Sequence, residues 1–229
     1  MCGRYSLATP DPSSLRERFP VGERVELRRR YNVAPGDDVV AVTTDRDGVP
    51  RGDVLRWGLV PHWADDPGAL GLKLINARAE TAAEKPAFRD AFARRRCLVL
   101  ADGFYEWERR PDGTTQPWWV TRAGGEPFAF AGLWASWHGP AGVEPLRTCS
   151  IVTTEASEAL AHIHGRMPVI LEPGAEDAWL DASTPPAVLR ELCVPFRETG
   201  TRAVGHAVND ARYDGPACLE EAAPPLTLF

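Results

Sequence analysis

The sequence predicts an α+β fold with an antiparallel, barrel-like β core and peripheral helices. Short runs rich in β-branched and aromatic residues recur from the N-terminus to about residue 172, as expected of strands. Helical patterns are fewer and lie between or after these runs. The 21 prolines and 20 glycines are spread over all 229 residues instead of marking one linker, which favours a single domain over residues 1–229.

The expected strands alternate with segments rich in turn-forming residues. We expect strands at 4–8, 37–44, 53–60, 96–108, 117–122, 127–137, 147–154 and 167–172. The C-terminal PLTLF (residues 225–229) fits either a last short strand or a loose tail.

A smaller number of segments carry helical signals. The first has Asp11 at the N-cap position and Pro12 in its first turn, and it runs through Phe19. Residues 84–95 form an amphipathic pattern with four apolar side chains facing inward, namely Ala87, Phe88, Ala91 and Phe92. Further helices are expected at 155–161, 176–180 and 185–192.

The composition is that of a globular protein, with 44% apolar and 25% charged residues. No run approaches the ~18 apolar residues that a membrane span requires, and the N-terminus lacks a secretory core. We therefore expect a cytoplasmic protein, nucleoid-associated if bacterial, with no membrane partner. The net charge of −6 argues only weakly against nucleic acid, because phosphate binding depends on local basic surface.

The five cysteines do not form a disulfide framework or a metal motif. Their number is odd and no C-x-x-C pair occurs among positions 2, 97, 149, 193 and 218. Cys97 and Cys149 lie in apolar runs, which predicts buried side chains. Cys2 is near a chain end and precedes Gly3, so we expect it to lie outside the deep core.

The position of Cys2 also has a chemical consequence. Loss of Met1 would leave a free α-amine beside the Cys2 thiol. An α-amine titrates at about 7.7–8.0 and a thiol at about 8.5, so both supply nucleophile near neutral pH. The amine can condense with an aldehyde to a Schiff base, and the thiol can then close a five-membered thiazolidine. A chance cysteine near the terminus is the alternative.

Three further polar residues follow or interrupt apolar runs. Asn76 and Arg78 lie on one side of a strand-like segment, where they could position a sugar oxygen and clamp a phosphate. A structural Asn in a turn and an exposed Arg are equally compatible with the pattern. Glu106 stands between Tyr105 and Trp107, where desolvation would raise its pKa and suit it to proton transfer. It could instead be the solvent-facing residue between two buried rings.

The segment HIHGRMPVILE (residues 162–172) places two histidines ahead of an apolar run. No Cys, Asp or Glu constellation with metal-ligand spacing completes a site for His162 and His164, so we expect no metal. His164 is better suited to acid–base chemistry, because histidine titrates near neutrality. Among the tryptophans, Trp57 and Trp63 flank a Gly- and Pro-containing segment and are candidates for stacking on unpaired bases.

Together these segments resemble the SOS response-associated peptidase (SRAP) family, also called abasic-site processing proteins. The matching blocks run in family order through most of the chain, and such a colinear set is highly specific. The blocks are MCGRY (1–5), YNVAP (31–35), RWGLVPHW (56–63), INARAET (75–81), RCLVLADGFYEW (96–107), FAGLW (130–134), IVTTEA (151–156) and IHGRMPVIL (163–171).

The resemblance implies a function in the DNA damage response. A member of this family has a groove for single-stranded DNA, and its N-terminal cysteine forms a thiazolidine crosslink with the opened abasic sugar. On matching positions, the catalytic residues are Cys2, Asn76, Glu106 and His164. The DNA-binding residues are Arg4, Asn32, Trp63, Arg78 and Arg166, with Asn32 also orienting groups around Cys2. The resemblance implies a monomer without cofactor or metal, with strand cleavage as a side activity.

Three segments depart from the family pattern. Gly165 stands where many relatives carry Asp or Asn. Asp37 and Asp38 place two acids in a loop that approaches DNA in the family, where they could weaken binding. Asp210 and Tyr213 replace residues that tend toward Ser and Asn.

Two other functions stay open from the sequence. Cys2, Glu106 and His164 could act as a thiol autopeptidase that processes the chain's own N-terminus. The chain could also be a single-stranded DNA-binding module that performs no chemistry.

Overall fold

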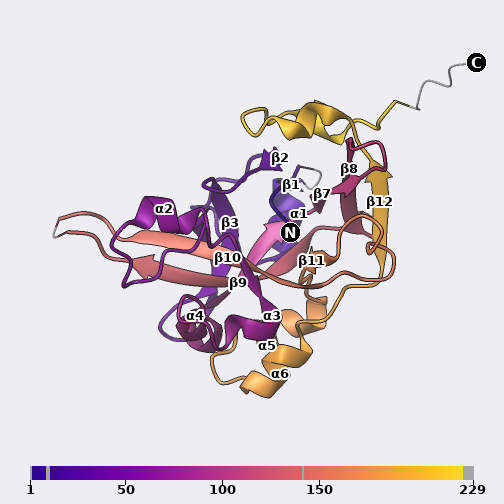
Figure 1. Cartoon of the computed structure of the whole chain (residues 1–229). Helices are drawn as coiled ribbons and strands as arrows, with labels where there is room; N and C mark the ends of the chain where they lie inside the picture. The colour runs from indigo at the N-terminus through magenta and orange to yellow at the C-terminus, as the bar shows by residue number, and fades with distance from the viewer. Residues whose placement is uncertain (1, 9–10, 141, 224–229) are drawn as a thin grey trace, which may run out of the picture.

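A closed five-stranded barrel forms the centre of the fold (Figure 1). The computed structural model describes residues 2–8, 11–140 and 142–223. The strands follow the order β10–β4–β3–β6–β9, and β9 pairs again with β10 to close the ring. They are β3 (Asp38–Thr44), β4 (Pro50–Trp57), β6 (Arg96–Ala101), β9 (Phe128–Trp137) and β10 (Leu146–Glu155). The predicted barrel-like core is confirmed, although β10 and β4 pair in parallel.

The strand β9 passes from one partner to the next at Gly132. This residue pairs with Cys97 of β6 and with Ile151 of β10. A Cβ atom at this position would lie 2.6 Å from the Cys97 Sγ atom. A residue without a side chain is therefore needed for the three strands to approach closely enough to close the barrel.

A second sheet of five antiparallel strands shares an apolar cluster with the barrel. Its order is β12–β8–β7–β1–β2, with β1 (Tyr5–Leu7), β2 (Arg30–Val33), β7 (Gly103–Arg109), β8 (Thr115–Arg122) and β12 (Thr199–Ala203). The chain crosses from the barrel to this sheet at Asp102, where the predicted strand 96–108 divides into β6 and β7. The Asp102 carboxylate accepts hydrogen bonds from the Ser6 hydroxyl (2.6 Å) and the Ala8 N–H (2.8 Å), which join β1 to the crossing point.

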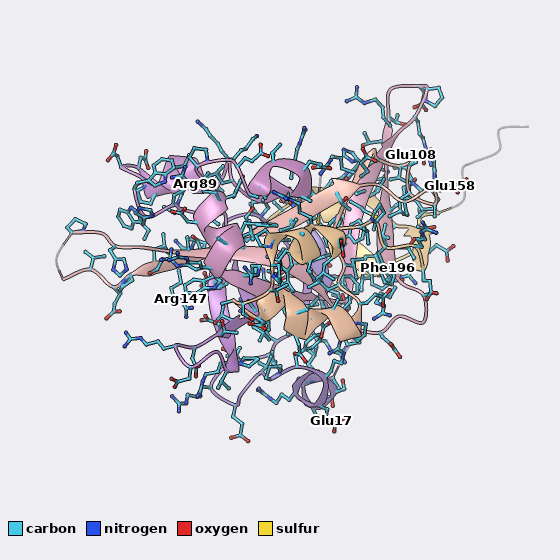
Figure 2. The ribbon with its side chains drawn as sticks, turned by 90° about the horizontal axis from the view of Figure 1, so that it is seen from below. Glu17, Arg89, Glu108, Arg147, Glu158 and Phe196 are labelled. Atoms are coloured by element: carbon cyan, nitrogen blue, oxygen red, sulfur yellow. The ribbon has the colours of Figure 1, made fainter. Side chains whose placement is uncertain are left out.

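Two short strands extend the pairing of β10. β5 (Asn76–Arg78) is parallel to it and β11 (Arg166–Pro168) is antiparallel. Thr153 pairs with a residue of each, so β5 and β11 lie on opposite edges of β10. Figure 2 shows Arg147, near the start of β10, and Glu158, beyond its end, on opposite sides of the molecule. The strands β5 and β11 pair with the second half of β10, and they therefore lie toward the side of the molecule where Glu158 is found.

Residues of β6 are buried on both faces, which explains its continuous apolar sequence. Cys97, Val99 and Ala101 face the cluster shared with the second sheet, whereas Leu98 and Leu100 face a second cluster that includes helix residues. The alternation expected of a half-exposed strand is therefore absent.

The helices are short and peripheral, and α3–α6 gather below the barrel in Figure 1. They are α1 (Pro12–Arg18), α2 (Pro67–Gly71), α3 (Ala79–Ala82), α4 (Arg89–Arg94), α5 (Glu176–Leu180) and α6 (Pro186–Glu191). Three 3₁₀ turns are η1 (Pro173–Ala175), η2 (His206–Asn209) and η3 (Pro216–Leu219). None of the helices in the described part of the chain has the length and apolar character needed to cross a bilayer.

The predicted helices are confirmed in part. Helices form within 11–19, 84–95, 176–180 and 185–192, but the second is reduced to α4 after the turn at Pro86. Of its inward residues, Ala87 is only half-buried. The helix predicted at 155–161 is wrong, because β10 continues to Glu155 and only isolated turns follow. Asp11 occupies the N-cap position, but its carboxylate accepts from the Ser13 hydroxyl instead of the helix backbone.

The predicted strands correspond to β1, β3, β4, β6–β10 and β11 with shifted ends. In the segment 167–172 only the first residues form a strand, as part of β11, and Ile170 forms an isolated bridge with Phe130. The strands β2 and β12 lie in segments for which no strand was predicted. The C-terminal PLTLF lies outside the described residues.

A buried arginine joins the barrel to two helices. Arg96, at the start of β6, is only 2% exposed. Its guanidinium donates to the carbonyls of Phe92 (2.7 Å) and Ala93 (2.8 Å) at the end of α4. It also donates to the carbonyls of Trp179 (2.6 Å) and Asp181 (2.6 Å) at the end of α5. One cation therefore satisfies the last carbonyls of two helices, where a positive charge is favourable.

Replacing Arg96 with methionine is expected to lower the free energy of unfolding by about 3–5 kcal/mol, because several buried carbonyls lose their donors. Urea denaturation measures the change. The matched control is Arg94→Met, which removes an exposed arginine from α4 and should change stability by less than about 0.5 kcal/mol. Equal effects of the two substitutions would contradict this account of Arg96.

Candidate active site

Cys2 lies just before β1, and its side chain is fully buried. It belongs to the apolar cluster that the barrel shares with the second sheet, and its thiol donates to the Arg4 carbonyl at 3.6 Å. The expectation that Cys2 lies outside the core is wrong, because β1 runs between β2 and β7 and carries the preceding residues inward. Burial raises the pKa of the Cys2 thiol far above its usual range, and the Glu106 carboxylate raises it further. In this arrangement the thiol is protonated at neutral pH.

Asn76, the first residue of β5, holds the backbone of Cys2. Its side-chain N–H donates to the Cys2 carbonyl at 2.8 Å, across 74 residues of sequence. The pairing of Asn76 with Ile151 of β10 fixes its position. Its Oδ1 atom is buried and accepts no hydrogen bond from the described residues. This oxygen is therefore available to accept from a bound molecule.

Glu106 lies in the middle of β7 with only 5% of its surface exposed. Tyr105, on the opposite face of the strand, packs against residues of η2 and η3. On the other face, Glu106 lines a narrow cavity with His164 and Leu160. Both faces of β7 are covered, so the alternative of a solvent-facing Glu106 is wrong. Burial raises the pKa of the Glu106 carboxyl, an effect partly offset by the charge of His164.

The imidazole of His164 is held by the backbone of Arg166. Its Nδ1 atom lies 3.0 Å from the Arg166 nitrogen and 3.1 Å from the Arg166 carbonyl oxygen. When Nδ1 carries no proton, it accepts a hydrogen bond from the Arg166 N–H. When protonated there, it can donate to the Arg166 carbonyl. The ring therefore has a backbone partner in either protonation state, as a proton-transfer residue requires.

Two of the predicted DNA-binding residues are held within the protein. The Arg4 guanidinium donates to the Asn32 side-chain oxygen (3.1 Å) and to the Val208 carbonyl (2.8 Å). Asn32 is only 1% exposed, and its side-chain N–H groups donate to the carbonyls of Val208, Asp210 and Tyr213. A direct contact between Asn32 and DNA is therefore a wrong prediction. Asn32 instead orients Arg4, which is half-buried and retains part of its surface.

Arg78 and Trp63 are accessible. Arg78 lies two residues after Asn76 at the end of β5, is exposed, and forms no ion pair within the described part of the chain. Trp63 is 50% exposed, whereas Trp57 is fully buried and donates from its indole to the Ile75 carbonyl at 2.9 Å. Of the two tryptophans considered for stacking, only Trp63 therefore presents a surface to a ligand.

Two of the departures from the family pattern, the acids Asp37 and Asp38, lie beside arginines. The Asp37 carboxylate accepts from Arg30 (2.6 Å) and from the Ala34 N–H (3.1 Å), so it is paired within the protein, although Arg30 also contacts Asp214. Asp38 lies 3.6 Å from Arg56, and both are exposed. A Cβ atom on Gly165 would meet no atom within 4 Å, so nothing in the local packing requires glycine there.

Arg166, a predicted DNA-binding residue, contacts two residues that no motif singled out, Glu80 and Thr153. Arg166 is 84% buried by side chain, and it donates to both carboxylate oxygens of Glu80 and to the carbonyl of Thr153. No local spacing links these positions, because Glu80 precedes Arg166 by 86 residues. Their proximity follows from the pairing of β5 and β11 with β10, which the sequence pattern does not reveal.

The arrangement can hold a nucleophile and move protons around it. Cys2 is fixed through its own carbonyl, Glu106 influences its thiol electrostatically, and Glu106 and His164 line one cavity. A buried carboxyl with a raised pKa beside a histidine suits general acid–base chemistry. Among the described residues, no group of three or more His, Cys, Asp or Glu side chains is placed to hold a metal ion.

Comparisons with known proteins show which family and which solved structure this chain is similar to. The family model for SOS response associated peptidase (SRAP) matches residues 1–211. The abasic site processing protein YoaM of Bacillus subtilis is 43% identical over 228 residues, covering 96% of this chain and 98% of that protein. The abasic site processing protein HMCES of Gallus gallus is 36% identical over 188 residues, covering 72% of this chain and 56% of that protein. A crystal structure of a Bacteroides thetaiotaomicron protein has the same fold, with a TM-score of 0.85, 24% identity, and coverage of 97% of this chain and 100% of that one.

Proposed function

This chain belongs to the SOS response-associated peptidase (SRAP) family, and from that premise we propose that it captures abasic sites in single-stranded DNA as a covalent crosslink through Cys2. The observation that carries the proposal is the position of Cys2. It is held through its carbonyl by Asn76, beside the buried carboxyl of Glu106. The names of the relatives support abasic-site processing, and the chemistry of the site supports the crosslink.

The first bond forms between the Cys2 nitrogen and the sugar. Loss of Met1 converts the Cys2 backbone nitrogen into an α-amine, which is the group that condenses with an aldehyde. Abasic deoxyribose exposes an aldehyde at C1′ when its ring opens, and His164 assists by moving a proton between the ring oxygen and the C1′ hydroxyl. The amine attacks C1′ to give a carbinolamine. In this proposal the Asn76 Oδ1 atom accepts a hydrogen bond from the opened sugar, a role supported by its burial without a partner among the described residues.

Glu106 completes the reaction by giving and regaining one proton. The protonated carboxyl donates to the carbinolamine hydroxyl, which leaves as water and forms the iminium. The Cys2 sulfur then adds to C1′, the C=N electron pair moves to nitrogen, and the thiol proton passes to the Glu106 carboxylate. The balance is one amine, one thiol and one aldehyde converted to a thiazolidine and water. Because burial keeps the thiol protonated, a nearby base is required at this step.

The DNA would approach along the accessible residues that flank Cys2. Arg78 and the exposed part of Arg4 supply charge for the phosphates, and Trp63 supplies a ring for an unpaired base. The Schiff base also acidifies the C2′ position, so β-elimination with strand cleavage is a side reaction of the same intermediate.

The family description names a peptidase, and this makes self-processing of the N-terminus a second candidate. In that function Glu106 would promote removal of Met1. We expect instead that Glu106→Ala loses Met1 as completely as the wild type, because a general aminopeptidase accepts a small second residue. Intact mass spectrometry of both proteins measures this, with Glu108→Ala as the control on the same strand. Retention of Met1 in Glu106→Ala alone would favour self-processing.

A further inference from the structure

Arg166 crosses over β10 to reach Glu80. Thr153 of β10 pairs with Arg78 of β5 on one edge and with Pro168 of β11 on the other. The Arg166 guanidinium donates to the two Glu80 carboxylate oxygens at 2.8 and 3.0 Å. On the way it donates to the Thr153 carbonyl at 2.7 Å and lies 3.3 Å from its hydroxyl. The contact is bidentate, which fixes orientation as well as distance.

Each end of this ion pair is attached to a residue of the candidate active site. Glu80 lies in the first turn of α3, which follows directly after the strand that carries Asn76. The Arg166 backbone holds the His164 imidazole through Nδ1. The Glu80–Arg166 pair therefore links the Asn76 side of β10 to the His164 side.

The environment of the pair favours a persistent contact. The Arg166 side chain is 16% exposed and that of Glu80 is 47% exposed. The Arg166 hydrogen bonds lower the pKa of the Glu80 carboxyl, so it remains ionised well below neutral pH. Part of Glu80 is exposed, and the charge of Arg78 also lowers its pKa, so this negative charge lies close to an arginine expected to face DNA.

We propose that Glu80 is a positioning residue for the crosslinking reaction, acting through Arg166 to fix Asn76 and His164 relative to each other across β10. This inference rests on the proposed function, since it concerns the rate of that reaction. It makes a specific demand: loss of Glu80 must slow the chemical step without weakening DNA binding. Removing an acid beside two arginines should leave affinity for single-stranded DNA unchanged or increase it.

The test is single-turnover crosslinking of Glu80→Ala at saturating single-stranded DNA that carries one abasic site. We expect the saturated rate to fall by about tenfold to a hundredfold, because displacement of reacting groups by an ångström has effects of that size. Affinity for undamaged DNA of the same length should be equal to that of the wild type or tighter. Glu80→Gln, which retains one acceptor for Arg166, should be intermediate. Glu84→Ala is the matched control, since Glu84 is exposed and forms no ion pair among the described residues.

A wild-type saturated rate for Glu80→Ala would overturn the proposal. So would a rate that falls together with DNA affinity and melting temperature, because that pattern indicates a general loss of structure. If the wild type itself forms no crosslink after loss of Met1, the proposed function fails and the role of Glu80 fails with it. A normal wild type with an unaffected Glu80→Ala removes only the role of Glu80.

Discussion

Cys2→Ala is expected to lose the heat-stable product with abasic DNA completely while it keeps a transient imine. Alanine at position 2 still acquires a free α-amine when Met1 is removed, so attack on the C1′ aldehyde remains available. Without the thiol the imine cannot close to a thiazolidine, and it hydrolyses. The substitution therefore separates the two nucleophilic atoms of Cys2.

Denaturing gel electrophoresis with and without borohydride measures both species. The wild type should give a shifted band that survives heating without reduction, whereas Cys2→Ala should give a band only after borohydride trapping. Cys193→Ala is the control, since Cys193 is a buried cysteine of the cluster that includes helix residues. A heat-stable band from unreduced Cys2→Ala would show that another group closes the adduct.

Glu106→Gln is expected to slow crosslinking by about 10²–10⁴-fold, the range typical for loss of a general acid–base group. Glutamine has nearly the shape of glutamate, so the packing of β7 should be maintained. It can neither donate the proton that removes water nor accept the proton of the Cys2 thiol. Glu108→Gln is the matched control on the same strand, because the Glu108 carboxylate contacts the Trp118 indole (2.9 Å) and does not line the cavity with His164.

The pH dependence distinguishes this role from a structural one. Burial raises the pKa of Glu106, so its acid form persists to higher pH than that of an exposed glutamate and declines as the pH rises through the raised value. The α-amine has the opposite dependence, since its reactive form increases toward pH ~8. The wild-type rate should therefore pass through a maximum. In Glu106→Gln the falling limb should be absent, and a falling limb at the wild-type position would contradict the assignment.

The barrel was predictable because its strands carry strong local signals. β6 and β9 are long apolar runs, and their burial on both faces follows from that composition. The parallel pairing of β10 with β4 was not predictable, because register between distant strands depends on how the barrel closes. β2 and β12 have few apolar residues, and no residue of β12 and only Asn32 and Val33 of β2 are fully buried, which leaves no periodic signal.

The sequence indicated which candidate residues carry reactive groups, but it did not indicate how deeply they are buried. Position and neighbours suggested Cys2 and Glu106, yet only the central place of β1 explains why Cys2 is buried. Asn32 belongs to the YNVAP segment that resembles the family, but its side chain donates its hydrogen bonds to backbone carbonyls of this protein. The contact between Glu80 and Arg166 depends on tertiary pairing, so no local pattern could predict it.

The most direct test of the covalent mechanism is mass spectrometry of the peptide that remains attached to abasic DNA after proteolysis. We expect the adduct on the N-terminal peptide beginning with Cys2, with one water lost, no free thiol, and resistance to borohydride. Both the amine and the thiol would then be bonded to C1′. An adduct on Lys73 or Lys85, the two lysines of the chain, or an attached Cys2 with its thiol still free to alkylate, would contradict the thiazolidine mechanism.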